Sequence, residues 1–171
     1  MTRNFSLPVL SALLFLSACS GNKTKSGEAS DSVDSTMTES YSTVPEWEDK
    51  DSTIYGRAEG FGQSAFTLVA NDGREFDIAL TSEKDDDPYG EIYGDREDTA
   101  RYAVTTRDND ENLSVMINLS QLEKYTKDYE IYNCHLILND NGRRDLVTII
   151  ELNDSIFSAK GLSGKDYLYH R

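Results

Sequence analysis

Apolar and polar residues alternate with a period of two through most of the chain after residue 53. This alternation is typical of strands that bury one face, because successive side chains of a strand point to opposite sides. Apolar positions with this spacing predict strands at residues 54–61, 66–70, 76–80, 102–106, 113–119, 132–138, 156–160 and 166–170. A further run at residues 146–150 is almost continuously apolar, which indicates a strand buried on both faces.

Turn-forming residues separate these strands. Asn71-Asp72-Gly73 is typical of a tight hairpin, and polar turns are expected at residues 108–112, 139–142 and 161–165. Residues 120–128 form the one short helical candidate. Short strands joined by closely spaced turns favour a mainly β fold with a small closed barrel or a sandwich.

The N-terminal segment has the layout of an export signal. Arg3 precedes an apolar stretch from Phe5 to Leu16, which is too short to span a bilayer stably. Leu16-Ser17-Ala18-Cys19 resembles a bacterial lipobox, in which a branched apolar residue and two small residues precede Cys. The resemblance implies that residues 1–18 are a cleaved signal peptide and that several acyl chains on Cys19 anchor the protein in a membrane. The alternative is an ordinary secretory signal in which the Cys has no role.

Residues 20–53 are dominated by Ser, Thr, Asp and Glu, and their few apolar residues follow no period. Such a segment cannot bury enough apolar surface to offset the entropy of ordering it. The sequence therefore predicts that the lipidated Cys and a disordered tether occupy residues 19–53 and hold the domain on the order of 30 Å from the membrane. Trp47, the only Trp, lies near the end of this tether, where it can already pack on the domain.

Several segments resemble a group of small lipoproteins from Bacteroidota. The similar residues are 51–56, 71–73, 90–95, 117–119, 150–157 and 164–171. The resemblance implies an OB-like small barrel at residues 54–119 and a lipocalin-like β meander at residues 120–171. The C-terminal part has too few strands for a complete lipocalin barrel. This argues against a lipocalin-type cavity and leaves open that both parts form one continuous β domain.

The charge balance and the cysteine count exclude several classes of protein. The chain has 171 residues with 17 Lys+Arg against 31 Asp+Glu, a formal net charge of −14. An acidic chain without a basic stripe lacks the electrostatic footprint of a nucleic-acid-binding protein. Two Cys residues cannot form a disulfide framework, and a single apolar stretch excludes a multi-pass membrane protein.

Residues that could carry catalysis or bind a cofactor do not gather in the sequence. Neither His135 nor His170 has a metal-ligand partner at a typical spacing, and the motifs of zinc proteases, α/β-hydrolases and P-loop proteins are missing. No enzymatic activity, catalytic residue or cofactor is therefore expected. Cys134 shares a predicted strand face with Leu136 and Leu138, so we interpret it as a reduced thiol in the core.

Acidic residues are densest in a run that consists of Glu83, Asp85, Asp86, Asp87, Glu91, Asp95, Glu97 and Asp98. Carboxylates in a loop can ligate Ca²⁺, but the D-x-D-x-D-G spacing of a calcium loop is absent. Asp108, Asp110 and Asn112 have a related spacing and lack the Gly and the distal Glu that complete such a loop. Solvated loops are therefore favoured over a weak cation site, and no metal site is predicted.

Tyrosine is abundant, with 10 residues in the chain. One interpretation is a sugar- or peptide-binding surface, since aromatic side chains with a polar end suit interfaces. The candidates for such a surface are Tyr89, Tyr93, Tyr125, Tyr129, Tyr132, Tyr167 and Tyr169. The simpler interpretation is that Tyr is favoured in strands.

A three-residue pattern resembles the O-glycosylation sequon of exported Bacteroidota proteins, Asp followed by Ser or Thr and then a small or apolar residue. It occurs in the predicted tether at Ser32, Ser35 and Ser52, and later in the chain at Thr99 and Ser155. Because the tether is accessible, Ser32, Ser35 and Ser52 are the candidate modification sites.

Two functions are compatible with these features. The first is a non-enzymatic envelope lipoprotein with a binding or structural role, whose partner is a protein, glycan or peptide. The alternative is a lipocalin-like small-ligand binder. A closed pocket lined by Phe61, Phe66, Phe76 and Phe157 would favour this alternative, whereas an exposed aromatic groove would favour the partner-binding lipoprotein.

The residues after Cys19 bear on the location. In Bacteroidota lipoproteins, acidic residues just after the lipidated Cys are the pattern associated with export to the cell surface. Residues 20–25 of this chain do not resemble that pattern, because they contain two Lys and no acid. Ser20 also differs from the Asp that favours retention in the inner membrane of other Gram-negative bacteria. The sequence therefore predicts attachment to the outer membrane with the domain facing the periplasm.

Overall fold

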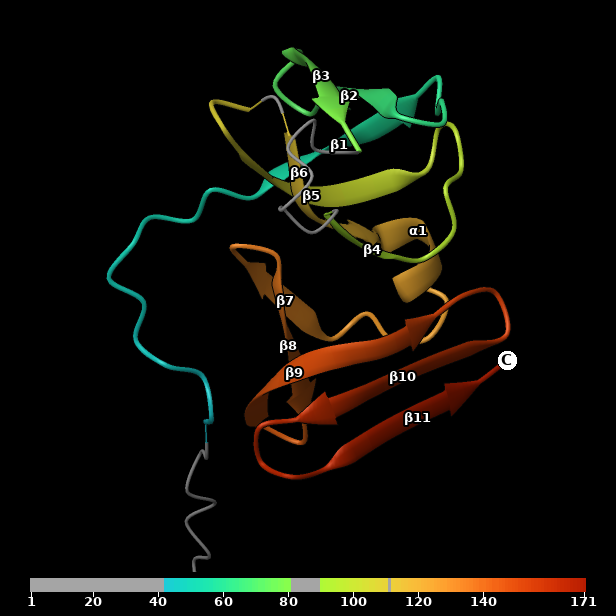
Figure 1. Cartoon of the computed structure of the whole chain (residues 1–171). Helices are drawn as coiled ribbons and strands as arrows, with labels where there is room; N and C mark the ends of the chain where they lie inside the picture. Colours follow the sequence, from blue (N-terminus) through green and yellow to red (C-terminus); the bar gives the residue numbers. More distant parts are fainter. Residues whose placement is uncertain (1–41, 81–89, 111) are drawn as a thin grey trace, which may run out of the picture. The chain divides into compact units, whose positions relative to one another are not determined.

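The computed structural model of the chain describes residues 42–80, 90–110 and 112–171 (Figure 1). The fold is mainly β, as the alternation predicts, and consists of two sheets. The first sheet contains β1 (Ile54–Glu59), β2 (Ala65–Ala70), β3 (Glu75–Ala79), β4 (Glu91–Tyr93), β5 (Arg101–Arg107) and β6 (Asn112–Asn118). The helix α1 (Leu119–Leu122) leads to the second sheet, which contains β7 (Tyr129–Tyr132), β8 (His135–Asp140), β9 (Arg143–Leu152), β10 (Ile156–Gly161) and β11 (Asp166–His170).

The first sheet closes into a five-stranded barrel of the OB type. Its strand order is β3-β2-β1-β5-β6 with antiparallel neighbours, and β3 meets β6 in parallel where Ala79 lies opposite Asn112. The short strand β4 also pairs in parallel with β6. The OB-like barrel implied by the family resemblance is therefore confirmed.

Apolar side chains of the barrel strands fill the barrel interior. The buried residues are Ala58, Phe66, Leu68, Ile78, Leu80, Ala100, Tyr102, Val104, Leu113 and Met116. The hairpin between β2 and β3 turns at Asn71-Asp72-Gly73, as predicted. The Gly73 N–H donates to the Ala70 carbonyl at 2.9 Å, and Gly73 adopts a φ of 86°, which glycine accepts without steric cost.

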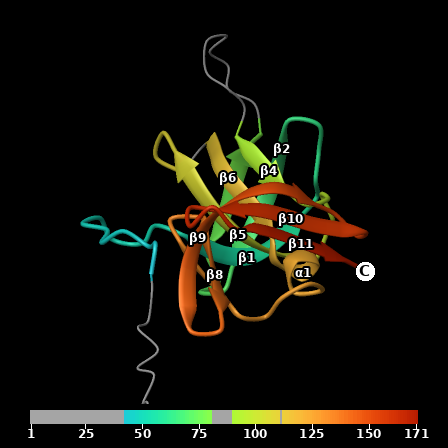
Figure 2. The same cartoon turned by 90° about the horizontal axis from the view of Figure 1, so that it is seen from below.

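The second sheet is an antiparallel meander in the order β11-β10-β9-β8-β7, which confirms the meander expected after the barrel. Figure 2 shows this sheet from below, with β9, β10 and β11 side by side. Its buried face contributes Leu136, Leu138, Val147, Ile149, Leu152, Phe157, Ala159 and Tyr167 to a second core.

Strands β5 and β6 are shared between the two cores. Tyr102 and Met116 pack in the barrel core, whereas Ala103 and Ile117 pack in the core of the second sheet. Both sheets belong to one compact unit. Of the two arrangements left open above, the structure thus has the barrel and the meander as one continuous β domain.

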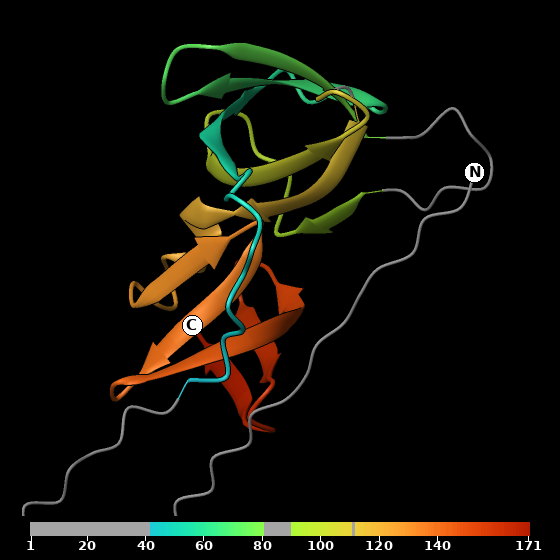
Figure 3. The same cartoon turned by 90° about the vertical axis from the view of Figure 1, so that its left-hand side faces the viewer.

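Residues 42–53, which we call the strap, run along the second sheet before the chain enters β1 (Figure 3). The Thr43 N–H donates to the Arg144 carbonyl at 3.0 Å, and Trp47 stacks on Tyr132 with ring centroids 4.6 Å apart. The prediction of a disordered tether is therefore wrong for the strap, because these contacts offset the entropy of ordering it. The other residues of the predicted tether, with Cys19, Ser32 and Ser35, lie outside the described residues, as does the signal segment.

The strand predicted at residues 132–138 is instead a hairpin. β7 ends at Tyr132 and β8 begins at His135, with Asn133 and Cys134 as a two-residue turn. Both turn residues have a positive φ, 48° and 54°. Two consecutive positive φ values are typical of a type I′ turn, and the alternation of residue types does not reveal it because neither residue is glycine.

The strap stabilises this unusual turn. Asp51 accepts the Asn133 N–H at 2.9 Å, and the Thr53 hydroxyl oxygen accepts the Cys134 N–H at 3.1 Å. Burial by itself raises the pKa of Asp51, but the hydrogen bonds from Thr53 and Asn133 outweigh it and hold that pKa below its ordinary value. A contact between residues far apart in sequence therefore supports a turn that local sequence does not favour.

The apolar run in β9 is buried on one face only. Ile149 is 6% exposed, whereas Ile150 is 66% exposed. A bulge in the pairing of β9 with β10 places Ser158 opposite Glu151 and Ala159 opposite Ile149. This bulge leaves Ile150 without a partner on β10. The side chain of Ile150 points to the face opposite Val147 and Ile149, and this outer face is open to solvent, so the prediction of burial on both faces is wrong at this residue.

The helix predicted at residues 120–128 is present but shorter, at Leu119–Leu122. The Asn118 side chain caps it by accepting the Gln121 N–H at 3.0 Å. In the part of the chain that the structure describes, no helix has the length and apolar character needed to cross a bilayer.

Candidate functional site

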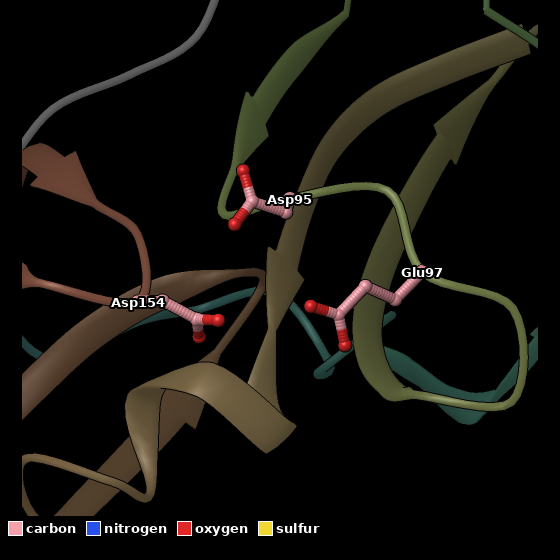
Figure 4. A group of neighbouring side chains, drawn as sticks. All are labelled: Asp95, Glu97 and Asp154. Atoms are coloured by element: carbon pink, nitrogen blue, oxygen red, sulfur yellow. The ribbon is translucent and has the colours of Figure 1, made fainter.

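Three carboxylates from distant parts of the chain meet beside α1 (Figure 4). Asp95 and Glu97 follow β4, and Asp154 lies between β9 and β10. One ligand oxygen of each lies within 4.8 Å of the others, and all three residues are exposed. We call these three residues the acidic trio. The fold thus brings two members of the predicted acidic run together with a third acid that the run did not include.

Two buried amides hold Asp95 and Asp154 of the acidic trio in place. Gln121 Nε2 donates to Asp95 at 2.5 Å and to Asp154 at 3.3 Å, and Gln121 Oε1 accepts the Asp95 N–H at 2.7 Å. Asn118 Nδ2 donates to the Asp95 carbonyl at 2.9 Å. Because an unsatisfied buried amide costs about 1–3 kcal/mol, these bonds tie the loop after β4 to the β9–β10 turn.

A lysine already supplies positive charge to the acidic trio. Lys124 Nζ forms an ion pair with Asp154, and this hydrogen bond lowers the pKa of Asp154 below its ordinary value. A hard cation needs several free oxygen ligands, whereas Asp95 and Asp154 both accept from Gln121. The arrangement therefore joins the barrel to the second sheet, and we assign no ion to it.

The other acids of the predicted run have separate partners. Glu91 accepts the Tyr93 hydroxyl at 2.7 Å, and Asp98 accepts the Phe61 N–H at 3.1 Å. Glu83 and Asp85, Asp86 and Asp87 lie outside the described residues.

The spaced acids between β5 and β6 form a turn. Asn112 Nδ2 donates to Asp108 at 3.0 Å, and the Thr106 hydroxyl donates to Asp110 at 2.5 Å. Asp108 and Asp110 both have a positive φ, a conformation that Asp and Asn tolerate better than most residues. These side chains therefore shape a hairpin turn, which agrees with the solvated-loop interpretation.

The histidines and the cysteine lie in different settings. His135 stacks against Trp47 with ring centroids 6.1 Å apart, whereas His170 is the last residue of β11. Cys134 is buried and free, and burial raises the pKa of its thiol to about 12. A thiol that stays protonated at neutral pH is a poor nucleophile. The prediction of a buried reduced thiol is confirmed, although Cys134 lies in a turn and not in a strand.

Most of the candidate tyrosines donate hydrogen bonds within the chain. The pairs are Tyr93–Glu91, Tyr125–Asn153, Tyr129–Glu123, Tyr132–Asp49 and Tyr167–Asp145. Tyr169 stacks on Phe157, and Tyr89 lies outside the described residues. The described candidates thus serve the packing of strands and loops, and the fold does not gather them into one binding surface.

An open groove lies between the strap and the β7–β8 hairpin, and we call it the strap groove. It has a volume of about 260 Å³ and is lined by Val44, Pro45, Trp47, Glu130, Ile131, Tyr132, Ile137 and Arg144. Trp47 and Tyr132 form an aromatic side, and Arg144 pairs with Glu130 at 2.6 Å. The groove combines an aromatic surface with charged hydrogen-bonding groups.

The four phenylalanines whose common pocket would have favoured the lipocalin-like alternative are divided between the two cores. Phe61, Phe66 and Phe76 pack in or against the barrel core, whereas Phe157 belongs to the core of the second sheet. Because β5 and β6 lie between these cores, the four rings cannot line a common cavity. The observation that would have favoured a small-ligand binder is therefore not made for these residues.

Asp145, in β9, is a buried carboxylate that the hydrophobic pattern alone did not single out. It is 3% exposed and accepts hydrogen bonds from the Thr43 hydroxyl at 2.7 Å, the Ser163 N–H at 3.0 Å, the Tyr167 hydroxyl at 3.0 Å and the Ser163 hydroxyl. Burial by itself raises the pKa of Asp145, but the donors outweigh burial and hold that pKa below its ordinary value. One carboxylate thus joins the strap, the β10–β11 turn and β11.

The position of Asp145 in the alternation was the available signal. Asp145 has the same parity as Val147 and Ile149, which places its side chain on the core face of the strand. Gly161 leaves the space for it, because a Cβ at Gly161 would lie 2.0 Å from an Asp145 carboxylate oxygen.

Ser52 is the one candidate glycosylation site within the described residues. It is exposed, and its hydroxyl and its N–H both donate to the Asn133 side chain, at 2.9 Å and 2.7 Å. The preceding Asp51 accepts three hydrogen bonds from Thr53 and Asn133. Both residues of this sequon therefore have a structural role in the strap.

Comparisons of the chain with protein-family models, with curated proteins and with solved structures found no match.

Proposed function

We propose that this protein is a lipid-anchored lipoprotein of the bacterial envelope that binds a protein or glycan partner at the outer membrane and has no enzymatic activity. The lipobox at residues 16–19 and the resemblance to small Bacteroidota lipoproteins support the anchor. The observation that carries the binding role is the strap groove, which is open and has Trp47 and Tyr132 on one side. Accessible aromatic side chains beside polar groups suit contacts with proteins and sugars.

The filling of the two cores weighs against the lipocalin-like alternative. The buried face of the second sheet packs against α1 through Leu119 and Leu122, and against the barrel through Ala103 and Ile117. Side chains therefore occupy the place where a lipocalin would hold its ligand. We accordingly favour binding at an exposed surface over binding in an enclosed cavity.

The anchor is tested by Cys19→Ala. We expect this variant to leave the membrane fraction and appear as soluble or unprocessed protein, because the acyl chains that hold the mature chain in the bilayer can no longer be attached. Fractionation of cells followed by detection of the chain measures this. Full retention of the Cys19→Ala variant in the membrane would show that another feature anchors the protein.

The same cells report which face of the membrane the domain occupies. We propose that it faces the periplasm, since residues 20–25 carry no acid. Proteinase K added to intact cells should then leave the chain uncut, whereas the same protease should cut it after the outer membrane is opened. Cleavage in intact cells would instead place the domain on the cell surface.

The binding role is tested by photo-crosslinking at the strap groove. A diazirine amino acid at Pro45, which lines the groove, should yield an adduct in native membranes. Trp47→Ala in the same chain should remove the adduct, because the partner loses its aromatic contact. A matched probe at the exposed residue Glu75 in β3 should yield none. Equal labelling from Pro45 and Glu75 would contradict a specific partner site in the groove.

A further inference from the structure

Strand β11 forms a free edge of the second sheet. Within the described residues it pairs with β10 alone, and Figure 1 shows it as the outermost strand of the lower sheet. A free edge presents backbone N–H and carbonyl groups that can pair with another strand. Natural edges are often blocked by lysine, proline or a bulge, so the residues on this edge decide whether it can pair.

The register of β11 shows which backbone groups are free. The Gly161 N–H donates to the Lys165 carbonyl, and the Arg171 N–H donates to the Ser155 carbonyl. Hydrogen-bonded and non-hydrogen-bonded pairs alternate along antiparallel strands. The odd-numbered residues of β11 therefore bond to β10, whereas the N–H and carbonyl groups of Asp166, Leu168 and His170 point away from the sheet.

The side chains of the same three residues are evenly spaced about Leu168. Leu168 lies at the centre and is 59% exposed, with Asp166 two residues before it and His170 two residues after it, both exposed. Tyr167 and Tyr169 face the other side, where Tyr169 stacks on Phe157. The exposed face of β11 thus has an apolar centre with an acid at one end and an imidazole at the other.

We propose that β11 pairs with β11 of a second copy of this chain, antiparallel and about a two-fold axis at Leu168. The two five-stranded meanders then form one continuous sheet. Leu168 meets Leu168 of the other copy, and Asp166 meets His170 at each end. Each of the three outward N–H groups of one copy faces an outward carbonyl of the other, as in an isologous interface.

This register is the one that uses the whole edge. A shift by two residues places Asp166 or His170 opposite Leu168 and leaves one of the three outward residues beyond the end of the partner strand. A parallel arrangement places Asp166 beside Asp166, where like charges repel. In the antiparallel register, each Asp166 carboxylate instead faces an imidazole that can donate a hydrogen bond to it.

The test is disulfide crosslinking of the full chain in native membranes. At a hydrogen-bonded antiparallel pair the Cα atoms lie about 5.5 Å apart, within the range that a disulfide spans. Leu168→Cys should therefore give a covalent dimer on mild oxidation. Ile150→Cys is the matched control, since Ile150 is also well exposed but lies two strands from the edge. In the proposed dimer, the two substituted residues of this control would be separated by about 24 Å, or five strand spacings.

A charge reversal tests the register itself. In the Leu168→Cys chain, Asp166→Lys should lower the dimer yield about tenfold, because it removes at both ends the carboxylate that accepts from His170 and leaves two donors facing each other. It also replaces the ion pair of Asp166 with Lys160 in each chain by two like charges. Adding His170→Glu should restore the yield, because each ammonium introduced at residue 166 then faces a carboxylate of the other copy across the strand pair. The proposal is overturned if Leu168→Cys gives no more dimer than Ile150→Cys, or if the second substitution does not restore the dimer.

Discussion

Replacing Asp145 by alanine is expected to lower the free energy of unfolding by about 3–5 kcal/mol, because several donors that converge on this buried carboxylate lose a charged acceptor together. The Tyr167 hydroxyl, the Ser163 N–H and the Thr43 hydroxyl all donate to this carboxylate. The loss of these hydrogen bonds loosens both the strap and the β10–β11 turn. Urea unfolding of the purified chain measures the effect.

The matched control for this variant is Asp128→Ala. Asp128 is exposed and its side chain has no hydrogen-bond partner among the described residues, so this change should stay within about 0.5 kcal/mol of the parent. If Asp145→Ala and Asp128→Ala lowered the free energy of unfolding by similar amounts, the hydrogen bonds to Asp145 would not stabilise the fold as proposed.

The pH dependence of Asp145→Asn provides a second readout. The donors hold the pKa of Asp145 in the folded chain below its ordinary value, so the unfolded chain binds the proton more tightly. The stabilisation is therefore fully present above the unfolded pKa of about 4, and it is lost as the pH falls through the lower folded pKa. The stability difference between the parent and Asp145→Asn should shrink over that acidic range. A difference that stays constant down to low pH would contradict this role of the charge.

Truncation of Ile149 to alanine should cost about 2–5 kcal/mol, since it removes a buried side chain from the core of the second sheet and leaves a cavity. The neighbouring Ile150→Ala is the control, because it removes the same atoms from an exposed residue and should cost no more than about 0.5 kcal/mol. The two side chains are chemically identical and differ in their exposed fractions, 6% for Ile149 and 66% for Ile150.

Urea unfolding of both variants measures this contrast. If Ile149→Ala lowered the free energy of unfolding by less than roughly 1 kcal/mol, β9 would not be part of the core. Equal losses for both variants would instead contradict the placement of Ile149 on the core face of β9 and of Ile150 on its outer face.

The secondary structure was largely predictable because it depends on local pattern. Period-two alternation located most of the strands, and Asn71-Asp72-Gly73 located the hairpin between β2 and β3. The hairpin at Asn133-Cys134 was not predictable in the same way. Its positive φ values are supported by the strap residues Asp51 and Thr53, which lie about 80 residues earlier. No local propensity reports such a contact.

The candidate site was less predictable than the fold. The acidic run suggested one loop of carboxylates, but the acidic trio takes Asp95 and Glu97 from that run and Asp154 from another sheet. The strap groove depends on Trp47 stacking over Tyr132, again a contact between distant residues. Residue types at a given spacing identify candidate chemistry, whereas the convergence of side chains follows from how the sheets pack.

The order of residue types in this chain is sufficient to specify β-strands, the tight turns that contain glycine and the acidic character of the chain. It also carries the parity that places Asp145 on a core face, although a pattern of apolar positions does not mark a buried acid. The sharing of β5 and β6 between two cores, the exposure of Ile150 and the docking of the strap arose from packing. Strand alternation follows from the backbone geometry of each residue. Bulges, shared strands and long-range hydrogen bonds instead depend on which segments pair with one another. The pairing is the one that minimises the free energy of the whole domain.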